Sequence, residues 1–276
     1  MNFNLHSHSH YSDGKLSIED HVTTAIDLGF HTIGFSDHSP LPFAAYFAMD
    51  ADKIGNYSDE ILAMKEKYKE KINIYLSMEM DYIPNVSYDF NSWDVNFDYL
   101  IGSVHLVGKK QDQLWFIDGP KQETYDEGLV NFYDNDIKKA VKAYYTQVQE
   151  MIDTQRFNIV GHLDKIRMHN NGRYFNEDEQ WYLKLVDDTL DLIKEKNLLM
   201  EVNTRGIYKK RSTDVFPNYA VLQKASAIGI PVCISSDAHH PSELNLGYQE
   251  AKETLIKAGY KSQYYYTQGI FVEEEI

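Results

Sequence analysis

Residues 17–36 read SIEDHVTTAIDLGFHTIGFS, a helix-forming segment followed by a glycine and a short apolar segment. Ser17 and Asp20 have the spacing of a capping box, apolar residues recur behind them at helical intervals, and Gly29 is a typical helix stop. The apolar segment HTIGFS has the length and composition of a buried strand. Residues 221–235, VLQKASAIGIPVCIS, repeat this order. The repetition predicts an α/β fold made of successive βα units.

Further strands are predicted at residues 2–5, 72–77, 99–104, 158–161 and 198–203, and helical stretches such as 136–155 and 177–196 separate most of them. The total of about seven βα units is typical of a barrel. Because no low-complexity linker divides the chain, residues 1–276 are expected to form a single domain. Residues 90–133 interrupt the pattern and are expected to hold one strand and a long loop. The run Glu273–Glu275 is expected to be a solvated tail.

Composition excludes several classes of protein. With 276 residues, 43% of them hydrophobic, the chain can bury a large core, which excludes a disordered tail. The 27 basic and 42 acidic residues leave a net charge of −15, so neither nucleic acid nor an anionic membrane is an expected partner. A single cysteine, Cys233, cannot form an intramolecular disulfide, which favours a cytoplasmic location. The first residues have no signal-peptide pattern, and no apolar run approaches the ~18 residues of a membrane span.

Histidine and acidic side chains gather where the predicted strands end. They are His6, His8, Asp13, His38, Glu79, His105, His162, Asp237 and His239. In a parallel barrel the carboxyl ends of all strands open on one face, so these side chains are expected to converge. His6 and His8 alternate along a strand and therefore point to the same side. Imidazole and carboxylate ligands suit Zn²⁺, Mn²⁺ or Fe²⁺, and nine such groups exceed what one ion can use. The pattern predicts a multinuclear metal site.

These residues resemble the PHP (polymerase and histidinol phosphatase) superfamily. Its first motif, HxHxxxSDG, appears at residues 6–14 as HSHSHYSDG. The segments GFSDHSPLPF (34–43), DYLIGSVH (98–105), GHLDKIR (161–167) and EVNTRGIYKK (201–210) are most similar to the histidinol-phosphate phosphatase branch. The resemblance spans residues 5–241. It implies a distorted (β/α)7 TIM-like barrel, which agrees with the strand count.

Carried over residue by residue, the resemblance implies two or three divalent ions, Mn²⁺, Fe²⁺ or Zn²⁺. The implied α ligands are His6, His8, Glu79 and Asp237, the β ligands are Glu79, His105 and His162, and the γ ligands are Asp13, His38 and His239. Glu79 would bridge the α and β ions. The implied activity is hydrolysis of a small phosphate monoester, L-histidinol phosphate of histidine biosynthesis, by attack of a metal-bridging hydroxide.

Other residues are predicted to contact the substrate. Arg205 and Arg167 follow strand ends, and a guanidinium group matches two phosphate oxygens. A surface ion pair is an equally open role for Arg167 and for Lys165. Asn203 and His10 are further candidates for substrate binding, although His10 could also face solvent. Asp37 or a metal-bound water could protonate the leaving alkoxide.

The loop at 90–133 could supply an acidic, aromatic wall for an ammonium and an imidazole group, through Trp93, Asp94, Trp115, Asp118 and Tyr125. The remaining histidines, His21, His31, His169 and His240, are expected to have structural roles.

Two alternatives to this function are open. The same metal site could act on a nucleotide or another small phosphate ester, which the charge of −15 disfavours. The chain could instead be a catalytically silent PHP module that binds a partner, although every expected ligand position holds a competent residue. The sequence indicates no oligomeric state.

Overall fold

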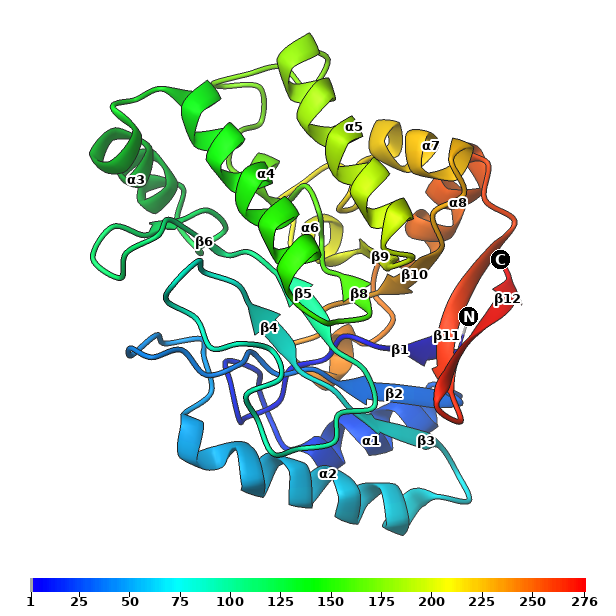
Figure 1. Ribbon diagram of the computed structural model, residues 1–276. Coiled ribbons are helices and arrows are strands. Elements are labelled where there is room, and N and C mark those ends of the chain that lie inside the picture. The colour runs from blue at the N-terminus through cyan, green and yellow to red at the C-terminus, as the bar shows by residue number, and fades with distance from the viewer. Residues whose placement is uncertain (1) are drawn as a thin grey trace.

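The computed structural model describes residues 2–276, and its centre is a barrel of parallel strands (Figure 1). One sheet has the order β1 (Phe3–Asn4), β2 (Thr32–Phe35), β3 (Asn73–Leu76). The other has the order β10 (Val232–Ser235), β9 (Leu199–Asn203), β8 (Ile159–Val160), β5 (Ile101–Ser103), β4 (Glu79–Asp81). Single bridges between Ser7 and Ala238 and between His38 and Glu79 join the two sheets.

Eight strand segments, which form seven strands, build this barrel in the described residues. β3 and β4 are two parts of one strand, because the register that pairs Thr32 with Asn73 also pairs His38 with Glu79. Each of the seven predicted strands overlaps one of these segments. The prediction of a distorted seven-stranded barrel is therefore confirmed.

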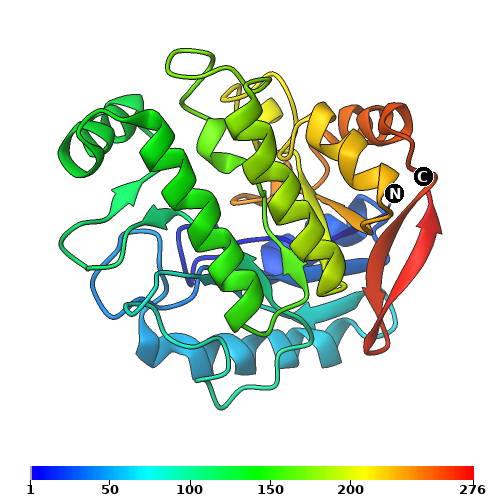
Figure 2. The same ribbon diagram turned by 45° about the horizontal axis from the view of Figure 1, so that its top comes forward.

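Helices surround the barrel (Figures 1 and 2). In Figure 2, α4 and α5, green and yellow-green, lie side by side over the strands. Ser17 Oγ accepts from the Asp20 amide at 3.1 Å and Asp20 Oδ2 accepts from the Ser17 amide at 3.0 Å, so the capping box is confirmed. The predicted helices at 136–155 and 177–196 correspond to α4 and α5. The helices are α1 (Ile18–Asp27), α2 (Ile54–Tyr68), α3 (Gln122–Tyr133), α4 (Ile137–Thr154), α5 (Gln180–Glu195), α6 (Arg205–Tyr208), α7 (Tyr219–Ala227) and α8 (Tyr248–Ala258), with 3-10 turns at Ala51–Lys53, Lys165–Arg167 and Pro241–Glu243.

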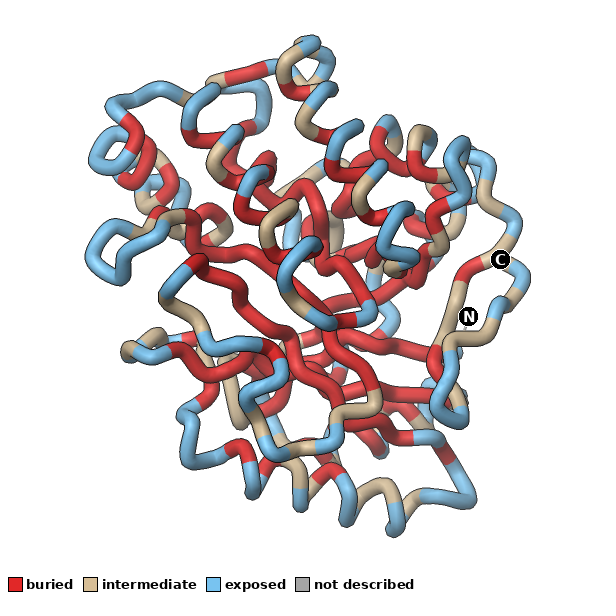
Figure 3. The backbone as a smooth tube through the Cα atoms, in the orientation of Figure 1, coloured by how far each residue is buried: buried red, intermediate tan, exposed pale blue. Residues whose placement is uncertain are grey.

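Burial follows the strands and the inner faces of the helices (Figure 3). A separate apolar cluster is made of inward-facing side chains such as Leu5, Tyr99 and Cys233. The antiparallel hairpin β11 (Ser262–Thr267) and β12 (Ile270–Glu275) packs on this cluster through Tyr266. Among the described residues, no helix combines the length and the apolar character needed to cross a bilayer.

Two sequence predictions about irregular segments are wrong. Glu273–Glu275 belong to β12 and pair with 262–264, so they are not a free tail. Residues 90–133 hold β5, the hairpin β6 (Leu106–Val107) and β7 (Trp115–Phe116), and helix α3. This excursion packs into the main apolar core, where Trp115 is fully buried and its Nε1 donates to the Tyr125 carbonyl at 2.9 Å.

Candidate active site

A cavity at the carboxyl ends of the barrel strands holds the predicted site. Its lining includes Asp13, His38, Glu79, His105, Asp237 and His239, and the buried residues His6, His8 and His162 adjoin them. All nine predicted side chains fall into overlapping groups whose ligand atoms lie close together. Glu79 belongs to the group with His105 and His162, and it also contacts the group that contains His6 and His8. The structure therefore brings the whole predicted set to one place.

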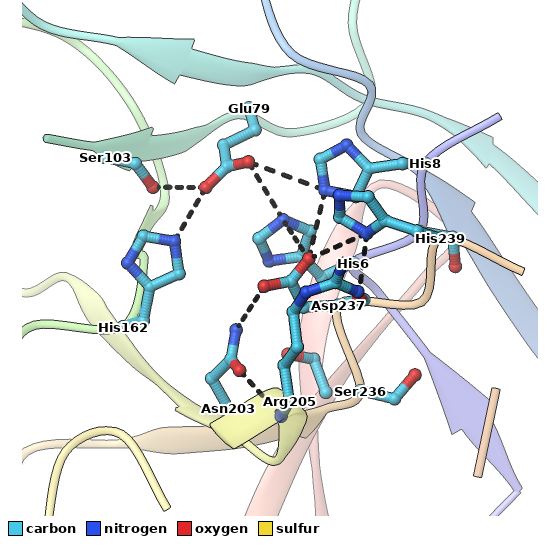
Figure 4. A network of polar contacts seen from close by, with 12 residues as sticks. His6, His8, Glu79, Ser103, His162, Asn203, Arg205, Ser236, Asp237 and His239 are labelled. Atoms are coloured by element: carbon cyan, nitrogen blue, oxygen red, sulfur yellow. Dashed lines mark hydrogen bonds and ion pairs between the residues drawn. The ribbon is translucent and has the colours of Figure 1, made fainter. Parts of the chain in front are cut away.

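The first group contains His6, His8 and Asp237, with Glu79 beside it (Figure 4). Nε2 of His6 lies 3.2 Å from Oε2 of Glu79. Nε2 of His8 lies 3.5 Å from the same oxygen and 3.3 Å from Oδ1 of Asp237. Both imidazoles point the same way because they alternate along the extension of the first strand.

The second group is reached through the other carboxylate oxygen of Glu79. Oε1 lies 3.0 Å from Nε2 of His162 and 3.5 Å from Nε2 of His105, and it accepts a hydrogen bond from Ser103 Oγ at 2.6 Å. The two imidazole Nε2 atoms are 3.2 Å apart. Glu79 thus stands between the two groups, as Figure 4 shows.

The third group joins His8, Asp13, His38 and His239. Oδ1 of Asp13 lies 3.1 Å from Nε2 of His239 and 3.9 Å from Nε2 of His38. A further group of His38, Asp81 and His105 was not predicted. Asp81 is the member of this group that the sequence did not predict, and the distance from its Oδ2 atom to Nδ1 of His38 is 3.4 Å.

The electrostatics of these groups suit bound cations. Burial opposes ionisation of Glu79, yet the surrounding histidines, His6 first, hold the pKa of this carboxyl well below its usual range. Burial lowers the pKa of His8, whereas for His6 it is outweighed by nearby carboxylates, Glu201 foremost, and the pKa of His6 rises. Ionised carboxylates beside imidazoles form the donor set that divalent metals require.

Unpaired polar atoms support the same interpretation. Within residues 2–276, Nε2 of His6, Nε2 of His8 and Oδ1 of Asp13 are buried and form no hydrogen bond, and the only polar atoms described close to them are those of the other predicted ligands. Burying such atoms is costly unless something binds them. These residues therefore fit a metal centre.

Two carboxylates behind the histidines were missed by the sequence analysis. Oε1 of Glu201 lies 2.5 Å from Nδ1 of His6, and Oδ1 of Asp81 lies 2.5 Å from Nδ1 of His105. Such contacts fix the ring orientation and leave Nε2 to face the ligand group. The available signal was alternation, because Asp81 lies two positions from Glu79 and Glu201 lies two positions from Asn203.

The structure corrects the role predicted for Asp37. Its carboxylate is fully buried and accepts from the Ser9 amide at 2.8 Å, the Ser12 amide at 3.1 Å, Ser9 Oγ at 2.9 Å and Ser12 Oγ at 2.6 Å. These contacts hold the turn that carries Asp13. Both carboxylate oxygens of Asp37 are engaged in these hydrogen bonds and Asp37 is not among the residues that line the cavity, so the structure gives it a structural role in the turn and no support as a proton donor. Its neighbour His38 faces the site, and adjacent residues on an extended chain point to opposite sides.

Of the two roles left open for Arg167, phosphate contact and an ion pair, the structure shows an ion pair, and it is buried. The Nε of Arg167 donates to Asp164 Oδ2 at 2.7 Å, and the residue lies outside the cavity lining. Lys165 lines the cavity instead, with Nζ 3.6 Å from Oδ2 of Asp237 and 3.7 Å from Oδ2 of Asp118. The 3-10 turn at Lys165–Arg167 explains the exchange, because side chains two positions apart in it point in different directions.

Of the other predicted substrate residues, one lines the cavity and two do not. Arg205 lines the cavity, and its Nη1 donates to the Asp237 carbonyl at 2.7 Å. Asn203 is fully buried behind Asp237, to which its Nδ2 donates at 3.1 Å, and so it positions a predicted ligand. His10 is exposed beside Tyr11 and lies outside the lining.

The wall of the cavity differs from the predicted one. Of the five residues proposed, Asp118 lines the cavity, while Trp115 and Tyr125 are fully buried elsewhere and Trp93 packs on Tyr88. Asp94 is exposed. The aromatic side chains that line the cavity are Tyr46, Phe47 and Phe116.

The four histidines expected to be structural make local contacts. Nδ1 of His21 lies 3.0 Å from the Ser17 carbonyl, and Nε2 of His169 lies 2.8 Å from the Gly119 carbonyl. His31 and His240 contact the hydroxyls of Thr32 and Ser242.

Comparisons with known proteins identify the family of the chain and proteins of similar sequence and fold. The family model described as PHP domain matches residues 4–205. A Deinococcus radiodurans protein named "Probable histidinol-phosphatase" is 26% identical over 246 residues, which cover 87% of this chain and 86% of the relative. The histidinol-phosphatase of Bacillus subtilis is 21% identical, with 84% and 91% covered. The Lactococcus lactis histidinol phosphate phosphatase, crystallised with zinc, L-histidinol and phosphate, superimposes with a TM-score of 0.70 and 21% identity over 98% of each chain.

Proposed function

This chain belongs to the PHP domain family, and from that premise we propose that it is a metal-dependent phosphatase that hydrolyses L-histidinol phosphate to L-histidinol and phosphate. The observation that carries the proposal is the convergence of nine imidazole and carboxylate side chains at a cavity that also contains Lys165 and Arg205. The similarity to proteins named histidinol-phosphatase, and to a structure with L-histidinol and phosphate bound, supports the choice of substrate.

In this proposal the nine residues would be shared among two or three divalent ions. The α ion would take His6, His8, Glu79 and Asp237, the β ion Glu79, His105 and His162, and the γ ion Asp13, His38 and His239. When bound, such ions neutralise phosphate charge and lower the pKa of the attacking water. Their identity among Mn²⁺, Fe²⁺ and Zn²⁺ is the part of the proposal that metal analysis decides.

The chain's own cations position the phosphate group. Lys165 and Arg205 face the cavity beside Asp237, so both can reach phosphate oxygens. The Arg205 side chain is held in place because Nη1 also lies 3.3 Å from the Tyr208 hydroxyl and 3.5 Å from Oε2 of Glu243. A guanidinium held in this way stabilises the charge that develops on phosphorus oxygens without reorganising during the reaction.

Steady-state kinetics on purified protein tests the proposal. We expect kcat/KM for L-histidinol phosphate to exceed that for nucleoside monophosphates and sugar phosphates. Chelation should remove turnover, and one of Mn²⁺, Fe²⁺ or Zn²⁺ should restore it. A preference for nucleotides would support the alternative PHP phosphoesterase. If the protein is purified without bound metal and hydrolyses none of the esters after metal is added, it would instead be a silent binding module.

A further inference from the structure

One carboxylate in the cavity has no role in the ligand groups. The described residues place four carboxylates in the lining, and Asp13, Glu79 and Asp237 are accounted for by the proposed ions. Asp118 is the fourth, and the exposed fraction of its side chain is 9%. Within residues 2–276, its Oδ1 is buried without a hydrogen-bond partner.

The nearest charged groups leave Asp118 incompletely paired. Oδ2 lies 3.7 Å from Nζ of Lys165 and 3.9 Å from Nε2 of His105. Both distances exceed that of a hydrogen bond. A buried carboxylate in this position gains free energy from any further cation that enters the cavity.

The backbone holds Asp118 at a fixed distance from the ligand groups. The amide of Ile117 donates to the His105 carbonyl at 3.1 Å, so the excursion that leaves the barrel after His105 returns beside it. On the other side, the Gly119 carbonyl lies 2.8 Å from Nε2 of the buried His169. Asp118 is therefore placed by contacts on both neighbours and not by a free loop.

Aromatic rings line the same cavity as this carboxylate. The rings of Phe47 and Phe116 stack with centroids 5.4 Å apart, and Tyr46 lies 6.2 Å from Phe116. Phe47 lies 6.2 Å from the His105 ring, which connects the wall with the ligand groups. A carboxylate beside aromatic faces is suited to an organic cation.

We propose that Asp118 is a specificity residue that binds the ammonium group of an amino-alcohol phosphate and thereby selects phosphate esters that carry an amine over those that lack one. In L-histidinol phosphate two carbons separate the ammonium nitrogen from the ester oxygen, so the ammonium group must bind close to the phosphate. Asp118 meets this requirement because it lies beside both Lys165 and His105. This inference rests on the proposed function.

The test compares two esters that differ in the amine alone, L-histidinol phosphate and 3-(imidazol-4-yl)propyl phosphate. Asp118→Asn should lower kcat/KM for the first by about tenfold to a hundredfold, the range of a charge-assisted hydrogen bond, and change it little for the second. Asp118→Glu, which keeps the charge, should keep a preference for the amine. Asp112→Asn, at the exposed tip of the β6–β7 hairpin, is the matched control and should leave both values unchanged.

Bound metal measured in the same variants separates selection from metal binding. We expect Asp118→Asn to retain the wild-type metal content. An equal loss of kcat/KM on both esters, no loss on either, or a fall in metal content would overturn the inference while leaving the proposed function intact. If the wild-type protein hydrolyses neither ester, the proposed function fails and the inference fails with it.

Discussion

Replacing Arg167 with methionine asks whether this side chain supports the fold or binds phosphate. Its Nε donates to Asp164 at 2.7 Å, its Nη1 donates to Ser212 Oγ at 3.3 Å and its Nη2 donates to the Val215 carbonyl. Its guanidinium carbon lies 4.7 Å from the centre of the Phe216 ring. The exposed fractions of the Arg167 and Asp164 side chains are 7% and 0%. Methionine leaves the carboxylate buried without its cation, and breaking a buried pair in this way costs about 3–5 kcal/mol.

We therefore expect the free energy of unfolding of Arg167→Met, measured by urea denaturation with tryptophan fluorescence, to fall by about 3–5 kcal/mol. KM for the phosphate ester should change little, because the guanidinium lies outside the cavity lining. Arg173→Met is the matched control, since Arg173 forms a partly exposed ion pair with Asp126 at 2.7 Å, and exposed pairs contribute about 0–1 kcal/mol. The double variant Asp164→Asn/Arg167→Met should recover part of the loss, because it leaves no unpaired buried charge.

The opposite pattern would refute this reasoning. A loss of stability below about 1 kcal/mol, combined with a KM raised about tenfold, would show that Arg167 contributes to phosphate binding and little to the fold.

Four other perturbations probe the site and the fold. Glu79→Ala should lower kcat/KM by more than about a hundredfold and reduce the metal content measured by atomic absorption, because its two oxygens face two ligand groups; unchanged metal content would contradict the bridging role. Asp81→Asn should weaken metal affinity or activity about 10- to 100-fold, because an amide holds Nδ1 of His105 less strongly than the carboxylate does at 2.5 Å; Mn²⁺ titration after chelation measures this. Arg205→Ala should raise KM or lower kcat by about tenfold or more at unchanged metal content, whereas loss of metal would mean that Arg205 is structural. Burial lowers the pKa of His21 from 6.5 to about 4, so the unfolded chain binds the proton more tightly and stability falls as the pH drops from about 6.5 to about 4. His21→Leu should flatten the dependence of the unfolding free energy on pH by up to about 1.4 kcal/mol per pH unit in that window, and an unchanged slope would argue against a buried neutral His21.

The barrel was predictable because its strands and helix ends have strong local signals. Apolar segments bounded by glycine or by polar residues predicted the strands, and the capping box at Ser17 marked the first helix. The convergence of the predicted ligands followed from the parallel topology, which places every strand end on one face.

The roles of the residues that support the ligands were less predictable than the ligands themselves. Strand alternation explains part of this difference. Alternation along a strand predicts the orientation of His6 and His8, and Asp81 and Glu201 satisfy the same rule. It also opposes the role first given to Asp37, since the adjacent His38 faces the site.

Other errors arose where the local pattern depends on tertiary packing. The roles of Lys165 and Arg167 depend on a short 3-10 turn. Such a turn is too short for a repeating hydrophobic pattern that would indicate which side chains face the cavity. The C-terminal hairpin was also missed, and in the structure Gln268 and Gly269 adopt φ values of 50° and 86° between its two paired strands, the geometry of a two-residue hairpin turn.

The bridge between Ser7 and Ala238 is the seam at which the first and last strands of the barrel meet. It lies between His6 and His8 on one strand and between Asp237 and His239 on the other. Two of the three proposed ion sites therefore require the first and last barrel strands to be paired, although more than two hundred residues separate them in the sequence. Separation of these two strands would disrupt those two sites and leave intact the site formed by Glu79, His105 and His162. If the ions are released stepwise during denaturation, the order of release would therefore show which part of the barrel unfolds first.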